Sequence, residues 1–124
     1  MLIGEDLTRR VIGAAIEVHR ALGPGLLESA YEECLFYELG LQGIRCERQL
    51  EVPVLYKDME VAKAFRADLV VEQTVLLELK SVDRIERIHE AQLLTYLKLM
   101  HLRVGLILNF NTTTLKNGIV RRVL

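Results

Sequence analysis

The chain has 124 residues, of which 51% are hydrophobic and 27% charged, and its formal net charge is −1. This composition is typical of a globular protein and excludes a disordered or fibrous chain, and the length suffices for one domain with a buried core over residues 1–124. The near-neutral charge excludes a strong overall attraction to nucleic acid, so contact with phosphates would need local basic patches, a homo-oligomer, a partner protein or metal ions.

The sequence shows no pattern typical of a membrane segment or a secretion signal. Its apolar runs are far shorter than the roughly 20 residues that cross a bilayer, and acidic and basic residues already occur in MLIGEDLTRR. We therefore expect a cytoplasmic protein that does not bind a membrane. Cys34 and Cys46 lack the spacing of a zinc site or a disulfide framework, so we expect both thiols to be reduced.

The first third of the chain is predicted to form a helical hairpin. Apolar residues recur at helical spacing over residues 7–22, with Asp6 or Thr8 as the candidate cap. The sequence GPG then breaks the helix, and a second helical pattern runs from residue 26 to about 41.

The remainder of the chain is predicted to be rich in strands. We expect three strands with turns near 57–59 and 72–74, a helix over 86–101, a buried strand over 103–110 and, after the turn KNG, an edge strand. The order helix, helix, three strands, helix, strand, strand predicts an α/β fold with a mixed sheet flanked by helices.

Charged residues interrupt the apolar pattern of the second and third predicted strands. Regular alternation puts the residues of the second strand on two faces: Arg66, Asp68 and Val70 on one, and Phe65, Ala67, Leu69 and Val71 on the other. In the third strand, Glu78 and Lys80 share a face by the same rule. If residues 72–74 form the hairpin loop, Asp68 lies directly across from Glu78.

Two carboxylates in this position require a positive charge. Opposed Cβ atoms lie roughly 5 Å apart, and like charges at that separation destabilise a sheet. Lys80 supplies one positive charge, and a divalent metal ion would supply the larger share. The alternative is a solvated ladder in which Asp68 pairs with Arg66 or Lys80, but the apolar surroundings of Glu78 favour the metal site.

The predicted helix over 86–101 carries a stripe that is polar at its beginning and apolar at its end. The stripe consists of His89, Gln92, Leu93, Tyr96, Leu97 and Met100. An amphipathic helix with a polar border would explain such a pattern without any functional role.

These motifs resemble those of the PD-(D/E)XK nuclease superfamily, in which an Asp precedes Glu-x-Lys on the next strand. Asp68 stands about ten residues before Glu78-x-Lys80. The segments IGAAIEVHRALGPGLLESAYEECL, FRADLVVEQTVLLELKSV, HEAQLLTYLKL and GLILNFN further resemble the small bacterial GxxExxY branch, whose name describes GLLESAY. The proline that often precedes the Asp is missing here, but that proline is not a ligand.

The resemblance implies a restriction-endonuclease-like core in which a central β-hairpin carries the metal ligands. It also implies a Mg²⁺-dependent phosphodiesterase acting on nucleic acid, on DNA rather than RNA, with Mn²⁺ as a substitute ion. The site residues that follow are the metal ligands Glu28, Asp68 and Glu78, the catalytic residues Asp68, Glu78, Lys80 and Gln92, and the substrate contacts Tyr31 and Tyr96.

Other interpretations remain open from the sequence. A non-catalytic nucleic-acid-binding or scaffold protein on a nuclease fold would suit the near-neutral charge, and a metal-dependent hydrolase of a smaller phosphate ester would use the same residues. Glu28 also has a simpler explanation, because an acid in the first turn of a helix is stabilised by about 0.3–1 kcal/mol. We expect Glu28 either to bind the metal directly or to contact its bound water.

Overall fold

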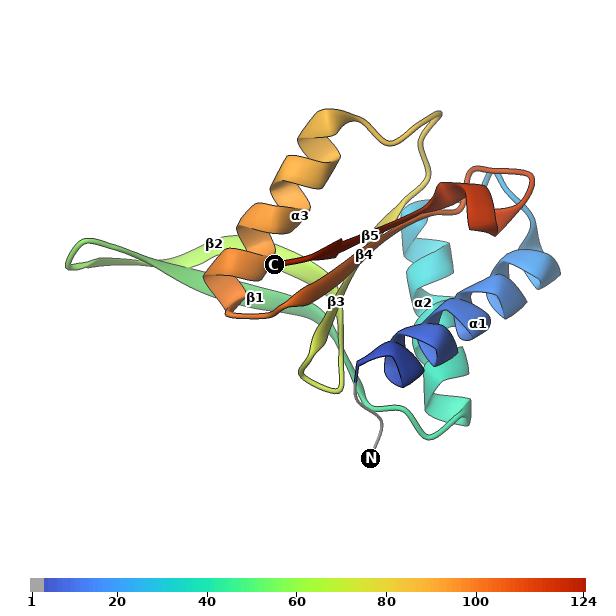
Figure 1. Ribbon diagram of the computed structural model, residues 1–124, viewed down its shortest axis with the longest axis horizontal. Helices are drawn as coiled ribbons and strands as arrows, with labels where there is room; N and C mark the ends of the chain where they lie inside the picture. The colour runs from blue at the N-terminus through green and yellow to red at the C-terminus, as the bar shows by residue number, and fades with distance from the viewer. Residues whose placement is uncertain (1–3) are drawn as a thin grey trace.

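The computed structural model describes residues 4–124, which form a mixed five-stranded sheet with helices packed on both faces (Figure 1). In chain order the elements are α1 (Glu5–Leu22), α2 (Glu28–Leu41), β1 (Cys46–Tyr56), β2 (Met59–Val71), β3 (Val75–Lys80), α3 (Arg87–Met100), β4 (Val104–Asn109), the 3₁₀ helix η1 (Leu115–Gly118) and β5 (Ile119–Val123). The predicted order of helices and strands and the α/β fold class are confirmed.

The strands lie in the sheet in sequence order, from β1 at one edge to β5 at the other. All neighbours are antiparallel except β3 and β4, which are parallel and are joined through α3, as a parallel pair needs a long crossover. In the β2–β3 hairpin, Leu69 pairs with Leu77 and Val71 with Val75. The predicted register and the three-residue loop are therefore confirmed.

The core consists of two clusters, one on each face of the sheet. On one face, α1 and α2 pack against the strands through residues that include Leu7, Leu35 and Leu77. On the other face, Leu93 and Leu97 of α3 pack on the strands. A methyl group on Gly105 of β4 would lie 2.8 Å from Leu93, so glycine allows α3 to approach the sheet closely.

The alternation predicted for β2 is wrong at Asp68. Ala67 packs beneath α3 together with Val70, whereas Leu69 and Val71 pack against α1 and α2. The two faces of the strand therefore exchange between Ala67 and Leu69, which regular alternation does not allow. The grouping of Ala67 with Leu69 and Val71 is corrected accordingly.

β1 is irregular at the same level of the sheet. The residue pairs on either side of Gln49 and Asp68 form regularly, but these two residues do not pair with each other. Gln49 has a φ of 49°, a left-handed conformation that is uncommon for residues other than glycine. A local break in the β1–β2 ladder therefore accompanies the change of face at Asp68.

The outer parts of β1 and β2 extend away from the helices as a two-stranded ribbon (Figure 1). Apolar side chains at its tip are exposed to solvent, among them Leu55, Tyr56 and Met59. Within residues 4–124 no third strand pairs with the tip of this ribbon, so the tip contributes little to the core.

Smaller details of the predicted elements also differ. The residue before α1 is Gly4, so Asp6 and Thr8 lie within the helix and neither is its N-cap. The sequence KNG belongs to η1 rather than to a simple turn. Cys34 and Cys46 are both free thiols, as expected. None of the helices in residues 4–124 is long and apolar enough to span a membrane.

Candidate active site

Asp68 and Glu78 meet where the regular pairing of β2 and β3 ends. The backbone N–H of Asp68 donates to Oε2 of Glu78 at 3.0 Å, and the backbone N–H of Leu79 donates to Oδ2 of Asp68 at 2.8 Å. Side-chain carboxylates thus accept the hydrogen bonds that backbone carbonyls accept elsewhere in the ladder. Only one oxygen of each carboxylate receives a protein donor within residues 4–124.

Burial makes this pair of carboxylates unfavourable in the ionised form. Glu78 is only 6% exposed, and its burial, followed by the charge of Asp68, raises the pKa of Glu78 to about 8. Burial likewise raises the pKa of Asp68, although the hydrogen bond from the Leu79 N–H opposes the shift. Two neighbouring, partly desolvated carboxyl groups with raised pKa values are typical of a site that binds a cation.

The solvated ladder considered as an alternative is not found. Asp68 forms no ion pair in the part of the chain that the structure describes, and Glu78 is buried rather than on an outward face. The charge of Lys80 lowers the pKa values of both Asp68 and Glu78. Lys80 also has no ion-pair partner among residues 4–124, so its ammonium group is not held by either carboxylate.

Glu28 is the first residue of α2 and lies near the carboxylate pair. Its Oε2 accepts a hydrogen bond of 3.1 Å from the backbone N–H of Ser81, directly after β3. Its charge contributes to raising the pKa values of Asp68 and Glu78. Glu28 is exposed and lines a pocket of about 610 Å³ together with Gly25, Leu26, Leu27, Ser29, Ser81 and Asn111.

Tyr31 has a different place from the one predicted. Its ring is fully buried and stacks on Phe110 at a centroid distance of 4.4 Å. Its hydroxyl donates to the carbonyl of Gly23 at 2.5 Å and accepts from the N–H of Leu26 at 3.1 Å. The predicted contact with substrate is corrected, because Tyr31 fixes the GPG loop that precedes Glu28.

Tyr96 lies on α3, and the carboxylate pair contributes to raising its pKa. It is half-buried and stacks on Phe65 at 3.9 Å, and burial, Glu78 and Asp68 together raise its pKa. Gln92 lies one turn earlier on α3 and is exposed. His89 acts at the start of the helix, where its Nδ1 accepts from the N–H of Glu86 at 2.9 Å.

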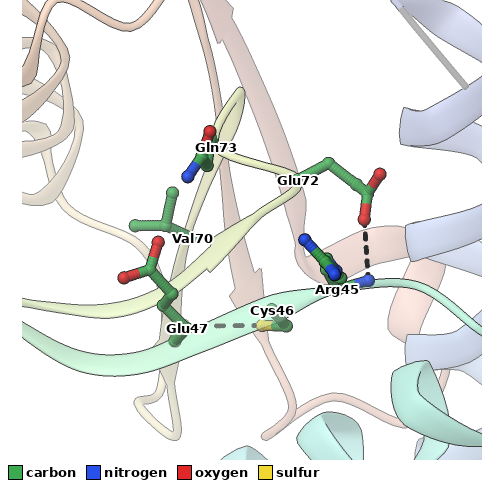
Figure 2. A pocket seen from close by; sticks show the side chains of 6 residues that line it. All are labelled: Arg45, Cys46, Glu47, Val70, Glu72 and Gln73. Carbon is green, nitrogen blue, oxygen red and sulfur yellow. Dashed lines mark hydrogen bonds between the residues drawn. The ribbon is translucent and has the colours of Figure 1, made fainter. Parts of the chain in front are cut away.

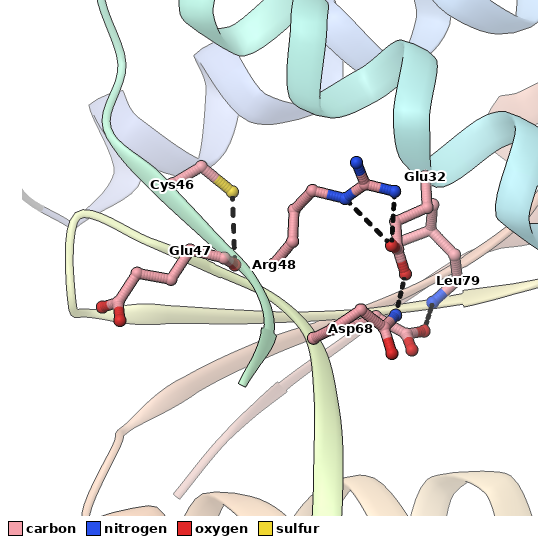
Figure 3. A network of polar contacts seen from close by, with 7 residues as sticks. Glu32, Cys46, Glu47, Arg48, Asp68 and Leu79 are labelled. Atoms are coloured by element: carbon pink, nitrogen blue, oxygen red, sulfur yellow. Dashed lines mark hydrogen bonds and ion pairs between the residues drawn. The ribbon is translucent and has the colours of Figure 1, made fainter. Parts of the chain in front are cut away.

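Glu32 was not identified from the sequence, although it lies one turn after Glu28 on α2. It is only 5% exposed, and its carboxylate accepts hydrogen bonds from Arg48 at 3.2 Å and Gln49 at 2.5 Å. Figure 3 shows Glu32 reaching from α2 toward Arg48 of β1, with Asp68 close by. The spacing of four residues from Glu28 is the signal that could have indicated it.

A further pocket of about 380 Å³ lies near the start of β1 and the β2–β3 turn. It is lined by Arg45, Cys46, Glu47, Val70, Glu72 and Gln73 (Figure 2). Glu72 there accepts a 2.7 Å hydrogen bond from the backbone N–H of Arg45, which closes the turn onto β1. The pocket contains none of the predicted site residues, so it is distinct from the carboxylate pair.

The donor set would suit a divalent ion that keeps part of its water shell better than a closed metal cage. Within residues 4–124, no three His, Cys, Asp or Glu side chains converge as a preformed metal site. Mg²⁺ is commonly held by one or two carboxylates, with water and substrate phosphates completing its shell. Asp68 and Glu78 provide two such carboxylates, and Glu28 is near enough to affect the pKa of each.

The fold and the site together define an α/β protein in which a central β-hairpin presents paired carboxylates and a lysine beside a helix that carries another acid. A family model described as the PD-(D/E)XK nuclease superfamily matches residues 5–123. The chain therefore belongs to the PD-(D/E)XK nuclease superfamily, whose nucleases generally use divalent metal ions. No curated protein and no solved structure matched the chain.

Proposed function

We propose that this protein is a Mg²⁺-dependent nuclease that hydrolyses phosphodiester bonds, with DNA as the preferred substrate. The observation that carries the proposal is the pair formed by half-buried Asp68 and buried Glu78, which are joined through backbone hydrogen bonds and have raised pKa values. A divalent cation would relieve their repulsion, and the family supplies the expectation of phosphodiester chemistry.

Asp68 and Glu78 would hold the ion, and Glu28 would bind it directly or through water. When bound, the ion lowers the pKa of a coordinated water and neutralises charge on the phosphate oxygens. The hydrogen bonds from Leu79 to Asp68 and from Asp68 to Glu78 orient both carboxylates before the ion arrives. This preorganisation reduces the reorganisation needed during the reaction.

Lys80 would stabilise negative charge on the phosphate or orient the attacking water. Its ammonium group is close enough to lower the pKa values of Asp68 and Glu78, yet no direct ion pair within residues 4–124 holds it. Gln92 on α3 would help to position the attacking water. Tyr96 would contact the substrate, because it lies within electrostatic range of both carboxylates. Exposure leaves the Gln92 amide accessible to a bound strand.

Cleavage of plasmid and single-stranded DNA in Mg²⁺ or Mn²⁺ tests the proposal. We expect wild-type protein to cleave at least one substrate and both Asp68→Ala and Lys80→Ala to lose at least a hundredfold in rate, as loss of a single electrostatic catalytic group typically costs. The matched control is Lys63→Ala in the ribbon, which should cleave normally. Equal cleavage by wild type and the two site variants would contradict the proposed active site.

A non-catalytic nucleic-acid-binding or scaffold protein is the competing function. The net charge of −1 and the exposed apolar side chains of Leu27, Tyr37 and Leu55 favour it, because a nuclease acting alone benefits from basic surface. Calorimetry with Mn²⁺ separates the two. Binding that disappears in Asp68→Ala supports the nuclease, whereas absence of binding in wild type favours the scaffold.

A further inference from the structure

The position of Asp68 depends on an irregularity that β2 shares with β1. Gln49 and Asp68 are at the same level of the sheet but do not pair, while the pairs directly next to them, Arg48 with Leu69 and Leu50 with Ala67, keep one register. Gln49 has a left-handed backbone with φ 49°. A glutamine gains no intrinsic stability from this conformation, so contacts of its side chain must compensate for the strain.

Glu32 of α2 provides those contacts. Its Oε1 accepts a hydrogen bond of 2.5 Å from the side-chain amide of Gln49, and its Oε2 accepts one of 3.2 Å from Nε of Arg48. The Arg48 guanidinium lies 5.4 Å from the centroid of the Phe36 ring, which limits its movement on the other side. Both oxygens of a nearly buried carboxylate are therefore occupied by two consecutive residues of β1.

The irregularity coincides with a change in the hydrogen bonds that Asp68 forms. In an unbroken ladder, backbone groups of β2 would pair with the neighbouring strands at this level. Instead, the Asp68 N–H donates to Glu78, and the Asp68 carboxylate accepts from Leu79. Glu32 thus contacts the break on its β1 side. The carboxylate pair lies beside the same break, on β2 and β3.

We propose that Glu32 is a positioning residue for the candidate metal site, acting through Gln49 to keep Asp68 out of the regular ladder and directed at Glu78. The inference rests on the proposed function for the role of Asp68 and Glu78 as ligands. In this role Glu32 would not contact the ion itself, because both of its oxygens are engaged by β1.

A simpler role for Glu32 would be to attach α2 to β1 through its ion pair with Arg48. The two roles differ in where a substitution acts. Loss of an attachment loosens the whole sheet, whereas loss of positioning affects the amides of Asp68 and Leu79, whose hydrogen bonds depend on the carboxylate pair. Leu77 is a suitable reference, because it pairs regularly with Leu69.

Amide hydrogen exchange of the full chain, measured by NMR without metal, distinguishes these roles. In Glu32→Gln, which has the same shape but presents an amide to two donors, we expect exchange at Asp68 and Leu79 to accelerate about tenfold, with Leu77 within about twofold of wild type. Glu33→Gln, an exposed neighbour on the same helix, should change none of the three. Uniform acceleration that includes Leu77, or no acceleration at Asp68 and Leu79, would overturn the proposal.

Gln49→Gly provides a second variant if Glu32→Gln does not fold. Glycine accommodates the left-handed backbone but lacks the amide that binds Glu32, so exchange at Asp68 and Leu79 should again accelerate. Wild-type exchange rates in this variant would contradict positioning through Gln49.

Mn²⁺ calorimetry then connects positioning to the site. We expect affinity about tenfold weaker in Glu32→Gln and unchanged in Glu33→Gln. Unchanged affinity in Glu32→Gln, when wild type binds, would overturn the proposal. A wild type that binds no Mn²⁺ would refute the proposed function alone, because the exchange measurement tests positioning without any metal.

Discussion

Charged side chains in the two halves of β2 differ in their exposure to solvent, and this exposure decides how strongly they interact with other charges. In the outer half, residues 59–66, Lys63 forms an ion pair of 3.6 Å with Glu51 of β1, and both side chains are largely exposed. In the inner half, residues 67–71, Asp68 meets Glu78 at a level where β1, β2 and β3 lie side by side. Solvent screens the outer charges, whereas burial raises the pKa values of both inner carboxyl groups.

This difference is the physical reason for placing the proposed site in the inner half of the strand. A charge in the ribbon needs no partner because water solvates it, so its identity has little effect on the fold. A carboxylate pair between two packed faces is tolerated only when it is protonated or neutralised by a cation. In the proposed function, the energetic cost of the inner pair is what binding of a divalent ion would relieve.

Shortening an apolar side chain should give the largest difference in stability between the inner and outer regions. Leu77 is fully buried opposite the inner half, whereas Leu55 on the ribbon is 70% exposed. We expect Leu77→Ala to lower the free energy of unfolding by about 3 kcal/mol through the lost packing, and Leu55→Ala by less than about 0.5 kcal/mol. Urea denaturation followed by circular dichroism measures both. A large loss in Leu55→Ala would show that the ribbon packs against a partner in solution.

The pH dependence of stability should reveal the inner pair in metal-free protein. The folded state raises the pKa of Glu78 from 4.5 to about 8, so folded protein binds more protons than unfolded protein between these values. Stability is then greatest below the unfolded pKa and falls as the pH rises through the folded pKa. We expect a loss on the order of 2 kcal/mol between about pH 5 and pH 9.

Glu78→Gln is the control for this measurement, because the amide oxygen can still accept from the Asp68 N–H while the charge is gone. Most of the pH dependence should disappear in this variant, and Mg²⁺ should stabilise wild type but not the variant at about pH 9. Thermal denaturation across the pH range provides the comparison. A wild-type stability that rises over this interval would contradict the assignment of a buried, repulsive pair.

The smallest effect is expected at the ion pair of the outer half. Lys63→Ala removes the contact with Glu51, and because both side chains are exposed we expect a change below about 0.5 kcal/mol. Urea denaturation at low and at high salt measures it. A loss that exceeds 1 kcal/mol and persists in high salt would mean that the ribbon charges are shielded from solvent.

Much of the fold follows from local sequence patterns. Helical spacing, the GPG break and the valine-rich alternating segments gave the order of elements correctly, because each pattern depends on neighbours within a few residues. The β2–β3 register also followed, since a three-residue loop determines every pair of a hairpin. The position of Asp68 opposite Glu78 therefore follows from the residue numbers and the loop length alone.

Other features required contacts between distant parts of the chain. The position of Tyr31 depends on its packing against Phe110, which is distant in the sequence. The family resemblance implied a substrate contact, whereas the structure has a buried side chain that holds the GPG loop. The change of face at Asp68 accompanies a left-handed residue in β1, Gln49, which is neither glycine nor asparagine and gives no local signal.

The sequence by itself determined the elements, their order and the opposition of two carboxylates across one hairpin. Only the tertiary structure decided that Glu78 is buried and Asp68 half-buried, that their hydrogen bonds replace part of the ladder, and that Glu32 reaches the break from α2. The reason is that residue spacing along a hairpin determines which residues are opposite each other. The burial and the pKa of these residues depend instead on which helices cover them, and those helices come from distant parts of the chain.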